Sequence, residues 1–385
     1  MAQEEFLKIN FFGPIKEITI ENVKPFTFFI GESGSGKSTL LKVLAMMRHM
    51  YKQINLRSYL KQGNVIDKTI DLRMADYLRN GGMTDYVKES TEIVYRKGTF
   101  EISYTKKGGL KGTRSVISRE DLSLEKISFL SDKRGSIASL LANLSDGASL
   151  GFYLTETFQD FKKATDEIKE LEMSYLGVRY FEKKAQNGTR QFFIGNATDA
   201  DDIYNIKFED ASSGIQTMTP LAVIAEYFSK HFDIIQASNA SIVGLLGQND
   251  SLSSFRHDMN IGDISNRAMH MIIEEPELSL FPKAQRSSLN MLVSKCLNSN
   301  INMTLTLATH SPYIINHLNL LIKAYDKEVN IEGAALDYDK TGVYVVENGT
   351  LRNMKVLNAH LINTDYLSDD IDEIYDEYDK LDELA

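Results

Sequence analysis

Residues 31–39 read GESGSGKST and match the pattern G-x-x-x-x-G-K-[ST] of a phosphate-binding loop. In such a loop the glycines permit a tight turn whose backbone N–H groups face a phosphate, the lysine adds a positive charge, and the next hydroxyl ligates Mg²⁺. An apolar segment at 27–30 precedes the loop, and residues 39–47 have a helical pattern whose positive end faces the anion. The sequence therefore predicts a nucleoside triphosphate site rather than a chance glycine-rich turn.

We expect the whole loop to contact the nucleotide. Lys37 is expected to face the β- and γ-phosphates, and Ser38 is expected to complete the shell of a Mg²⁺ ion. The predicted nucleotide-binding residues of the loop are Gly31, Glu32, Ser33, Gly34, Ser35, Gly36, Lys37, Ser38 and Thr39.

Two adjacent carboxylates end a second apolar segment. Residues 269–277 read MHMIIEEPE, which predicts a buried strand that stops at Glu274 and Glu275. We assign Glu274 to the metal, together with Ser38, and Glu275 to the attacking water as the catalytic base. The alternative is an exposed acidic strand end capped by Pro276, which the upstream phosphate loop makes less attractive.

A histidine and a Ser-Ser-Gly segment complete the set of candidates. Residues 305–312 read LTLATHSP, so an apolar strand delivers His310 to its carboxyl end, where ligands of open α/β sheets bind. We predict a catalytic role for His310 at the γ-phosphate or the water. Residues 211–216 read ASSGIQ before a predicted helix, and a helix start of this kind can bind an anion, although turns and caps use it constantly.

The order of GESGSGKST, ASSGIQ, MIIEEPELSLFP and ATHS closely resembles the ABC-type ATPases of the SMC, RecF and OLD branch. In that family these segments are the Walker A loop, the signature, Walker B with its D-loop, and the H-loop. The resemblance runs from Phe6 to about Gly349 and implies ATP and Mg²⁺ as ligands. It also implies a homo-oligomer, at least a dimer, in which ATP is sandwiched between subunits.

By that resemblance Ser212, Ser213 and Gly214 contact the ATP held by a second subunit, and residues 278–282 line the dimer seam. The chain departs from the family at Glu274, where aspartate is usual, and it offers no clear Q-loop glutamine. The segment ISFLSDKRGS at 127–136 resembles one in the bacterial defence branch, with Arg134 as its functional position.

The expected fold is an α/β phosphate-loop NTPase of the ABC ATPase type, with a mixed sheet, a β-rich antiparallel lobe and helical inserts. We expect one ATPase domain over 1–350, with the β-lobe at about 91–118 and 178–208 and helical inserts at about 48–90 and 150–176. A strand is expected at 115–118, and residues 238–268 look polar and loop-like. Residues 351–385 are expected to form an acidic tail.

The charge of the chain is concentrated at its end. The net charge is −10, and residues 365–385 hold ten acidic residues and one lysine, which leaves the remainder near neutral. Residues 1–10 carry no apolar signal core, and no apolar run approaches the roughly 20 residues that span a bilayer. Cys296 is the only cysteine, which excludes an internal disulfide. We therefore expect a cytoplasmic protein without membrane contact.

Spacing narrows the choice within the resembled family. The 172 residues between Thr39 and Ser212 carry no long heptad run, unlike the arms of an SMC protein. The 75 residues after His310 are too few for the nuclease domain of an OLD protein. The chain thus resembles stand-alone ATPase subunits of bacterial phage-defence systems of the PARIS kind. It is expected to be a slow ATPase that holds and releases a separate effector nuclease in response to a phage trigger protein.

The main alternative is a RecF- or SMC-like ATPase that binds duplex DNA in repair. The cations for phosphate contacts would be Lys106, Lys107, Lys111, Arg114, Lys183, Lys184 and Arg190, which ordinary solvated hairpins also explain. A transporter subunit fits poorly, because the long inserts and the sequence EEPELSLFP differ from that class.

Overall fold

The fold is described from a computed structural model that covers residues 3–63, 72–142, 151–197, 204–247, 260–356, 358–367 and 369–382. Within these residues one large mixed sheet has eleven strands in the order β6-β5-β4-β1-β2-β15-β14-β3-β13-β12-β7, and a separate antiparallel sheet has the order β11-β10-β9-β8. A small pair, β16 (Lys355–Val356) and β17 (Leu361–Ile362), lies near the end of the chain. The predicted mixed α/β fold with an antiparallel lobe is confirmed.

Five neighbouring strands of the large sheet run parallel. They are β14 (Thr341–Glu347), β3 (Phe26–Ile30), β13 (Asn302–Thr309), β12 (Asn266–Glu274) and β7 (Ser123–Leu130). Because parallel strands end at one edge, the phosphate loop after β3, the carboxylates after β12 and His310 after β13 meet at the same edge.

The rest of the large sheet is a mostly antiparallel wing. It contains β1 (Glu5–Phe12), β2 (Ile15–Ile20), β4 (Val87–Lys97), β5 (Phe100–Thr105), β6 (Gly109–Lys111) and β15 (Thr350–Asn353). The strand β1 pairs with both β2 and β4, whereas β15 pairs antiparallel with β14 and parallel with β2. The predicted boundary between residues 350 and 351 falls inside the sheet, since β15 spans it.

Two expectations about the β-rich lobe were wrong. The stretches at 91–118 and 178–208 do not share a lobe, because β4, β5 and β6 join the large sheet through β1. The second sheet consists of β8 (Glu170–Met173), β9 (Val178–Lys184), β10 (Arg190–Asn196) and β11 (Asn205–Lys207). No strand forms at 115–118. The third strand, β6, instead follows β5 at once, after a tight turn at Gly109 with a φ of 67°.

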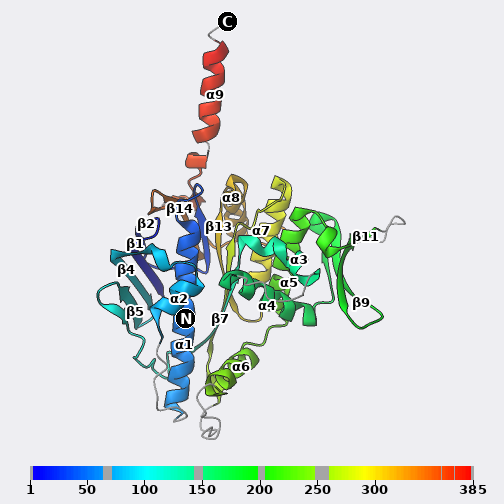
Figure 1. The fold of residues 1–385 in the computed structure, drawn as a ribbon. Helices are drawn as coiled ribbons and strands as arrows, with labels where there is room; N and C mark the ends of the chain where they lie inside the picture. The colour runs from blue at the N-terminus through cyan, green and yellow to red at the C-terminus, as the bar shows by residue number, and fades with distance from the viewer. Residues whose placement is uncertain are drawn as a thin grey trace.

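Helices cover both faces of the parallel strands. Alternate strand residues point to opposite faces, so that Phe28 packs with α5 (Ser213–Lys230), α7 (Pro282–Leu297) and α8 (Pro312–Asp326), whereas Phe29 packs with α1 (Lys37–Gln62). Figure 1 shows α1 on one side of the parallel strands and α7 and α8 on the other. The remaining helices of four residues or more in the described chain are α2 (Met74–Asn80), α3 (Ile137–Ala142), α4 (Phe152–Glu167), α6 (Ile234–Gly247) and α9 (Asp369–Asp382), together with the 3₁₀ turn η2 (Asp132–Ser136).

The predicted inserts are partly helical. The first helix continues from the loop to Gln62, and α2 follows the undescribed residues 64–71, before β4 begins at Val87. The insert near 150–176 contains α4, but its end is the strand β8. The segment 238–268 was expected to be a loop, yet its first part belongs to α6, while 248–259 lie outside the described residues.

The acidic tail forms the helix α9, which extends away from the body in Figure 1. Its side chains Ile374, Tyr378 and Leu381 are more than 60% exposed. These three residues are four and three positions apart, so they lie on one side of the helix. In the described part of the chain, no helix is long and apolar enough to cross a membrane.

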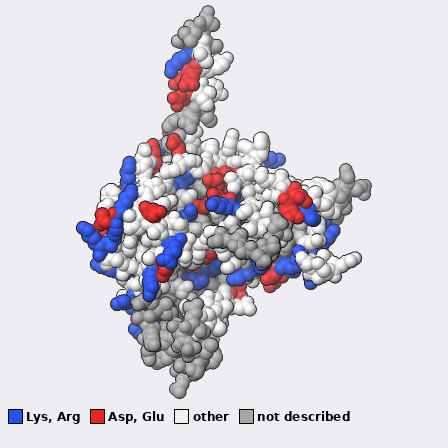
Figure 2. Space-filling view, viewed as in Figure 1, with Lys and Arg blue, Asp and Glu red and all other residues white. Residues whose placement is uncertain are grey.

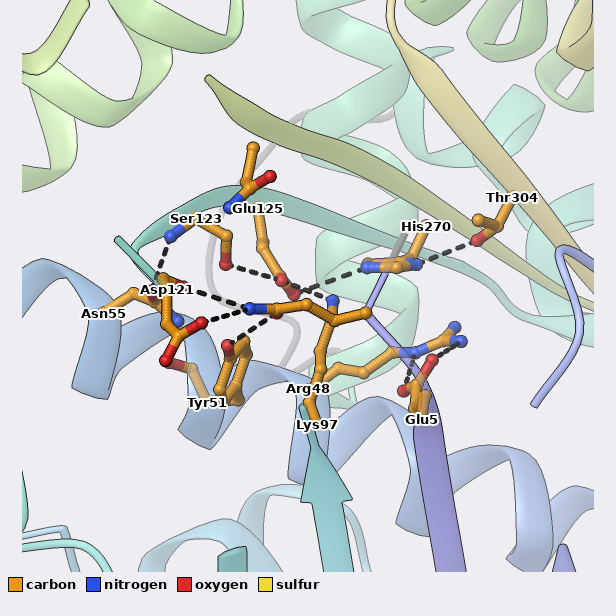
Figure 3. Close-up of polar contacts among 12 residues, drawn as sticks. Glu5, Arg48, Tyr51, Asn55, Lys97, Asp121, Ser123, Glu125, His270 and Thr304 are labelled. Carbon is orange, nitrogen blue, oxygen red and sulfur yellow. Dashed lines mark hydrogen bonds and ion pairs between the residues drawn. The ribbon is translucent and has the colours of Figure 1, made fainter. Parts of the chain in front are cut away.

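The opposite edge of the parallel strands contains a buried network of charged and polar side chains (Figure 3). Arg48 of α1 donates two hydrogen bonds of 2.8 Å to Glu5 of β1, and Lys97 of β4 lies 2.5 Å from Glu125 of β7. His270 of β12 lies 3.3 Å from the same carboxylate and 2.8 Å from the Thr304 hydroxyl of β13. This network joins α1, the parallel strands and the antiparallel wing.

Candidate functional site

The phosphate loop has the backbone that its sequence predicts. Gly34 and Gly36 have φ values of 80° and 112°, in the region that side chains disfavour. A Cβ on Gly31 would lie 2.2 Å from the carbonyl oxygen of Val346, so this position requires glycine because of close backbone approach. The loop therefore turns tightly between β3 and α1, and it leaves Glu32, Ser33 and Gly34 exposed.

Lys37 lies at the centre of this edge. Its ammonium donates to the carbonyl oxygens of Gly31 at 2.6 Å and Glu32 at 2.8 Å, and it lies 3.5 Å from His310 Nδ1. Burial lowers the pKa of Lys37 to about 8, against the opposing effect of nearby Glu275. The carbonyl contacts hold the amine beside the loop, where a phosphate would offer it stronger, charged partners.

Glu274 is the buried member of the carboxylate pair. It is 3% exposed, and burial raises the pKa of its carboxyl group above the ordinary value. The Ser38 hydroxyl and the backbone N–H of Asp132 are near enough to this carboxyl group to oppose the rise in its pKa. The structure thus brings together the two predicted metal-binding residues, Ser38 and Glu274.

Their oxygens fit a hard divalent cation. Mg²⁺ prefers oxygen ligands and takes one or two carboxylates beside substrate phosphates. A buried carboxyl group with a raised pKa gains from a neighbouring cation, which favours its ionised form. Among the described residues, no group of three or more His, Cys, Asp or Glu side chains could hold a metal by itself, so the remaining ligands would have to be water or substrate.

Glu275 and His310 are both about one-third exposed. His310 Nε2 lies 3.5 Å from the Glu275 carboxylate, and the other ring nitrogen faces Lys37 at 3.5 Å. The structure therefore places the two predicted catalytic residues next to each other and next to the loop lysine. Their separations exceed those of strong hydrogen bonds, so these contacts are weak and do not fix the imidazole tightly.

The predicted second-subunit residues lie at the start of α5. Ser212 and Ser213 are exposed, and the Ser212 side chain makes no capping bond. Gly214 is tightly packed, because a Cβ there would lie 2.7 Å from the carbonyl oxygen of Ser279. Near them Phe281, in the predicted seam at 278–282, is 79% exposed.

Sequence reasoning missed two residues of this edge. Glu277 accepts a hydrogen bond of 2.6 Å from the backbone N–H of His310 and so connects the ends of β12 and β13. Glu277 is the third glutamate of the sequence EEPE, so its position next to the carboxylate pair could have indicated it as a candidate. Asp132, whose backbone N–H opposes the rise in the pKa of Glu274, follows β7, and only the strand order brings it here.

A cavity of about 540 Å³ adjoins the phosphate loop. It is lined by Pro14 and Lys16 of the first hairpin, by residues 32–35 of the loop, and by residues 346–349 after β14. The exposed side of the loop therefore faces an open space that contains a lysine.

Sequence comparison gives no relative for this chain: no protein-family model matches it, and no curated protein does. Among solved structures, an SMC head bound to the C-winged helix domain of ScpA is 12% identical, covers 93% of this chain and 98% of its own, and has a TM-score of 0.42. The SMC head domain from Thermotoga maritima is 13% identical, with coverages of 92% and 99% and a TM-score of 0.32.

A dimeric ATP-binding cassette, MJ0796 bound to ADP and Pi, is 10% identical, with coverages of 91% and 100% and a TM-score of 0.30. All three likenesses are low in identity and in TM-score. The fold is accordingly assigned from its own strand order and phosphate loop: a mixed α/β sheet with a glycine-rich loop between β3 and α1.

Proposed function

We propose that this protein binds ATP at the carboxyl edge of its parallel strands and hydrolyses it to ADP and phosphate. The contact chain from Lys37 through His310 to Glu275 carries the proposal, because it joins a phosphate-binding group to two groups able to orient or deprotonate water. Hydrolysis also needs a cation, and Ser38 and Glu274 would hold Mg²⁺, which neutralises phosphate charge.

In this proposal the chain supplies each step with its own residues. The loop N–H groups and Lys37 bind the phosphates, and Glu275 accepts a proton from the attacking water. His310 orients the water or the terminal phosphate, and the Glu277 contact to its backbone fixes its position. About one-third of the Glu275 side chain is exposed, so that water can reach its carboxylate.

A second copy would complete the site. Ser212 and Ser213 are exposed at a helix start, where their hydroxyl and N–H groups could bind an anion. In this proposal the anion is the phosphate of an ATP molecule bound to a second copy of the chain. The exposed ring of Phe281 beside these serines supports an interface at this face, because large exposed apolar groups are favoured in the cores of interfaces. We therefore propose an ATP-dependent homo-oligomer with ATP between subunits.

The test of the enzymatic proposal is Glu275→Gln, which keeps the shape of the side chain and removes the base. We expect ATP affinity within about twofold of the parent and a turnover that falls roughly 10²–10⁴-fold. Titration with a fluorescent ATP analogue measures the first, and phosphate release measures the second. Parental turnover in this variant would exclude Glu275 as the base.

For the cellular role, we propose a sensor and scaffold that holds a separate effector, such as the nuclease of a phage-defence system. The helix α9 favours the existence of a partner protein, because Ile374, Tyr378 and Leu381 form an exposed apolar side on an acidic helix. Affinity purification of the full chain is expected to retain a second protein that Ile374→Ser/Leu381→Ser loses and the matched change Glu373→Gln/Glu377→Gln keeps. A trigger protein would release that partner.

Duplex DNA binding is the less favoured alternative. The seven candidate cations lie on two different sheets, around the β5–β6 hairpin and the β9–β10 hairpin, which are on opposite sides of the body in Figure 1. Two of the seven are paired with acidic residues: Lys106 lies 2.6 Å from Glu89, and Arg190 pairs with Asp166 and Glu182. Figure 2 shows Lys and Arg interspersed with Asp and Glu on the visible face, not one continuous basic surface.

A further inference from the structure

Arg134 is a fully buried cation next to the proposed hydrolytic site. It lies in η2, directly after β7, and its relative exposure is 0%. Burying a guanidinium away from water is unfavourable unless good hydrogen-bond acceptors replace the water. A buried arginine at this place must therefore have hydrogen-bond acceptors around its guanidinium.

The guanidinium binds four main-chain carbonyl oxygens from three segments. It donates to Ser131 in its own turn at 3.1 Å, to Glu274 at 2.7 Å and to Glu275 at 2.6 Å after β12, and to Thr217 in α5 at 3.2 Å. Each acceptor is a peptide oxygen, so the contacts fix backbone position.

The backbone held by two of these bonds is strained. Glu275 has a φ of 44°, a left-handed conformation that is unfavourable for a residue with a side chain. Its N–H still donates to Ala308 of β13 at 2.8 Å. The fork of Arg134 holds the carbonyl groups of Glu274 and Glu275 on the other side of this turn. The carboxylate direction of Glu275 depends on that turn.

The same guanidinium reaches the helix whose start is exposed. Thr217 lies one turn into α5, after Ser212 and Ser213, and its hydroxyl also donates to Leu278 at 3.0 Å. Gly214 packs against Ser279. The start of α5 and residues 274–279 are thus connected through Arg134, Thr217 and Gly214.

We propose that Arg134 is a positioning residue that ties the start of α5 to the backbone turn of Glu275, so that the carboxylate is aligned for hydrolysis only when α5 is correctly placed. This inference rests on the proposed ATPase function. Arg134 acts through Glu275 and makes no contact of its own with substrate. A ligand or second copy that shifts the exposed start of α5 would change hydrolysis without touching the phosphate loop.

The substitution Arg134→Lys keeps the positive charge and removes the forked guanidinium, so it tests whether the several hydrogen bonds of Arg134 matter. A single ammonium cannot reproduce the planar fork to consecutive carbonyl groups, so the turn at Glu275 should lose its orientation. We expect kcat to fall roughly 10²-fold, as for small misplacements of catalytic groups, with the Kd for ATP within about twofold of the parent. Thermal unfolding without nucleotide shows whether the variant is folded.

Gly135→Ala perturbs the same junction without changing Arg134. A Cβ at Gly135 would lie 3.1 Å from Cγ2 of Thr217, so η2 and α5 must separate slightly. We expect kcat to fall about threefold to tenfold. Thr217→Ser removes that methyl and keeps the hydroxyl, so the double variant Gly135→Ala/Thr217→Ser should recover parental kcat. A merely structural defect would not show this rescue together with unchanged ATP affinity.

The outcomes separate the two proposals. If the parent hydrolyses ATP and Glu275→Gln does not, but Arg134→Lys and Gly135→Ala both keep the parental kcat, the positioning role is wrong and the ATPase proposal stands. If Arg134→Lys does not fold, the Gly135→Ala cycle decides, and a kcat loss without rescue by Thr217→Ser overturns the inference. A parent that neither binds nor hydrolyses ATP overturns both.

Discussion

The two edges of the parallel strands β7, β12 and β13 carry charged residues of the same kinds in opposite arrangements. At the amino edge, Lys97 and Glu125 lie 2.5 Å apart, both less than 10% exposed (Figure 3). At the carboxyl edge, His310 and Glu275 lie 3.5 Å apart and about one-third exposed. The amino-edge charges form short, buried pairs beside a cavity of about 370 Å³, whereas the carboxyl-edge charges form longer, more exposed contacts next to the phosphate loop. The first arrangement indicates stability, and the second indicates function.

This comparison predicts that substitutions at the two edges will have separable effects. Changes at the carboxyl edge should lower ATP binding or turnover and leave the free energy of unfolding almost unchanged. Changes at the amino edge should do the reverse.

Lys37→Ala should have the largest effect, at the carboxyl edge. The variant loses the cation that faces the phosphates, so ATP turnover should fall roughly 10³-fold or more, and ATP binding should be undetectable by calorimetry. The melting temperature without nucleotide should stay near that of the parent. Near-parental ATP affinity would refute the assignment of the phosphate loop.

Lys97→Met should have the largest effect at the amino edge. The substitution leaves Glu125 buried beside His270 without its ammonium partner, and breaking such a pair costs about 3–5 kcal/mol. Chemical denaturation in urea measures the loss. The double variant Lys97→Met/Glu125→Leu is the control, since removal of both charges should restore much of the stability. An unchanged midpoint in Lys97→Met would contradict the stabilising role of the network.

The pH dependence of stability should also come from the amino edge. Burial lowers the pKa of His270 from 6.5 to about 4, so the unfolded chain binds a proton that the folded chain does not between these values. Stability should therefore fall as the pH drops from 6.5 to 4, by roughly 3 kcal/mol from this group. Below that, Glu5 adds a further loss as the pH falls from 4.5 toward 2, because Arg48 offsets the effect of burial and keeps the pKa of Glu5 at about 2.

Denaturation midpoints of the parent and of His270→Gln between pH 4 and 7 check this prediction. The variant should show a smaller slope over that interval. Equal slopes would mean that His270 is not buried in its neutral form.

Thr304→Val should have the smallest effect. It removes the hydroxyl that lies 2.8 Å from His270 Nδ1 and keeps the shape of the side chain. The expected loss is about 1 kcal/mol, the usual net contribution of a hydrogen bond. ATP turnover should be unchanged, and a marked loss of turnover would show that the two edges are coupled along β13.

The carboxyl edge was largely predictable from the sequence, because each motif is local. GESGSGKST, the Glu274–Glu275 pair and His310 each follow an apolar strand, and parallel strands bring their ends together. Ser131 to Arg134 was harder to place, since only the neighbouring position of β7 and β12 shows that this turn contacts Glu274.

The amino edge could not be predicted. Glu5, Arg48, Lys97, Glu125, His270 and Thr304 come from six elements, and no motif marks any of them as part of a charge network. The wing was misplaced for the same reason: pairing of β4 with β1 joins residues about eighty positions apart, which local alternation does not reveal. The helix α6 was missed because its small polar residues, such as Ser238 and Asn239, look like those of a loop.

The most direct test of the central claim mixes two inactive proteins. Ser212→Arg should block the exposed helix start, and Glu275→Gln should remove the base, so each alone should hydrolyse ATP slowly. In a dimer with shared sites, mixing gives some sites with both residues intact, so we expect recovery of about a quarter of parental turnover. A mixture no more active than its separate components would contradict a site shared between copies.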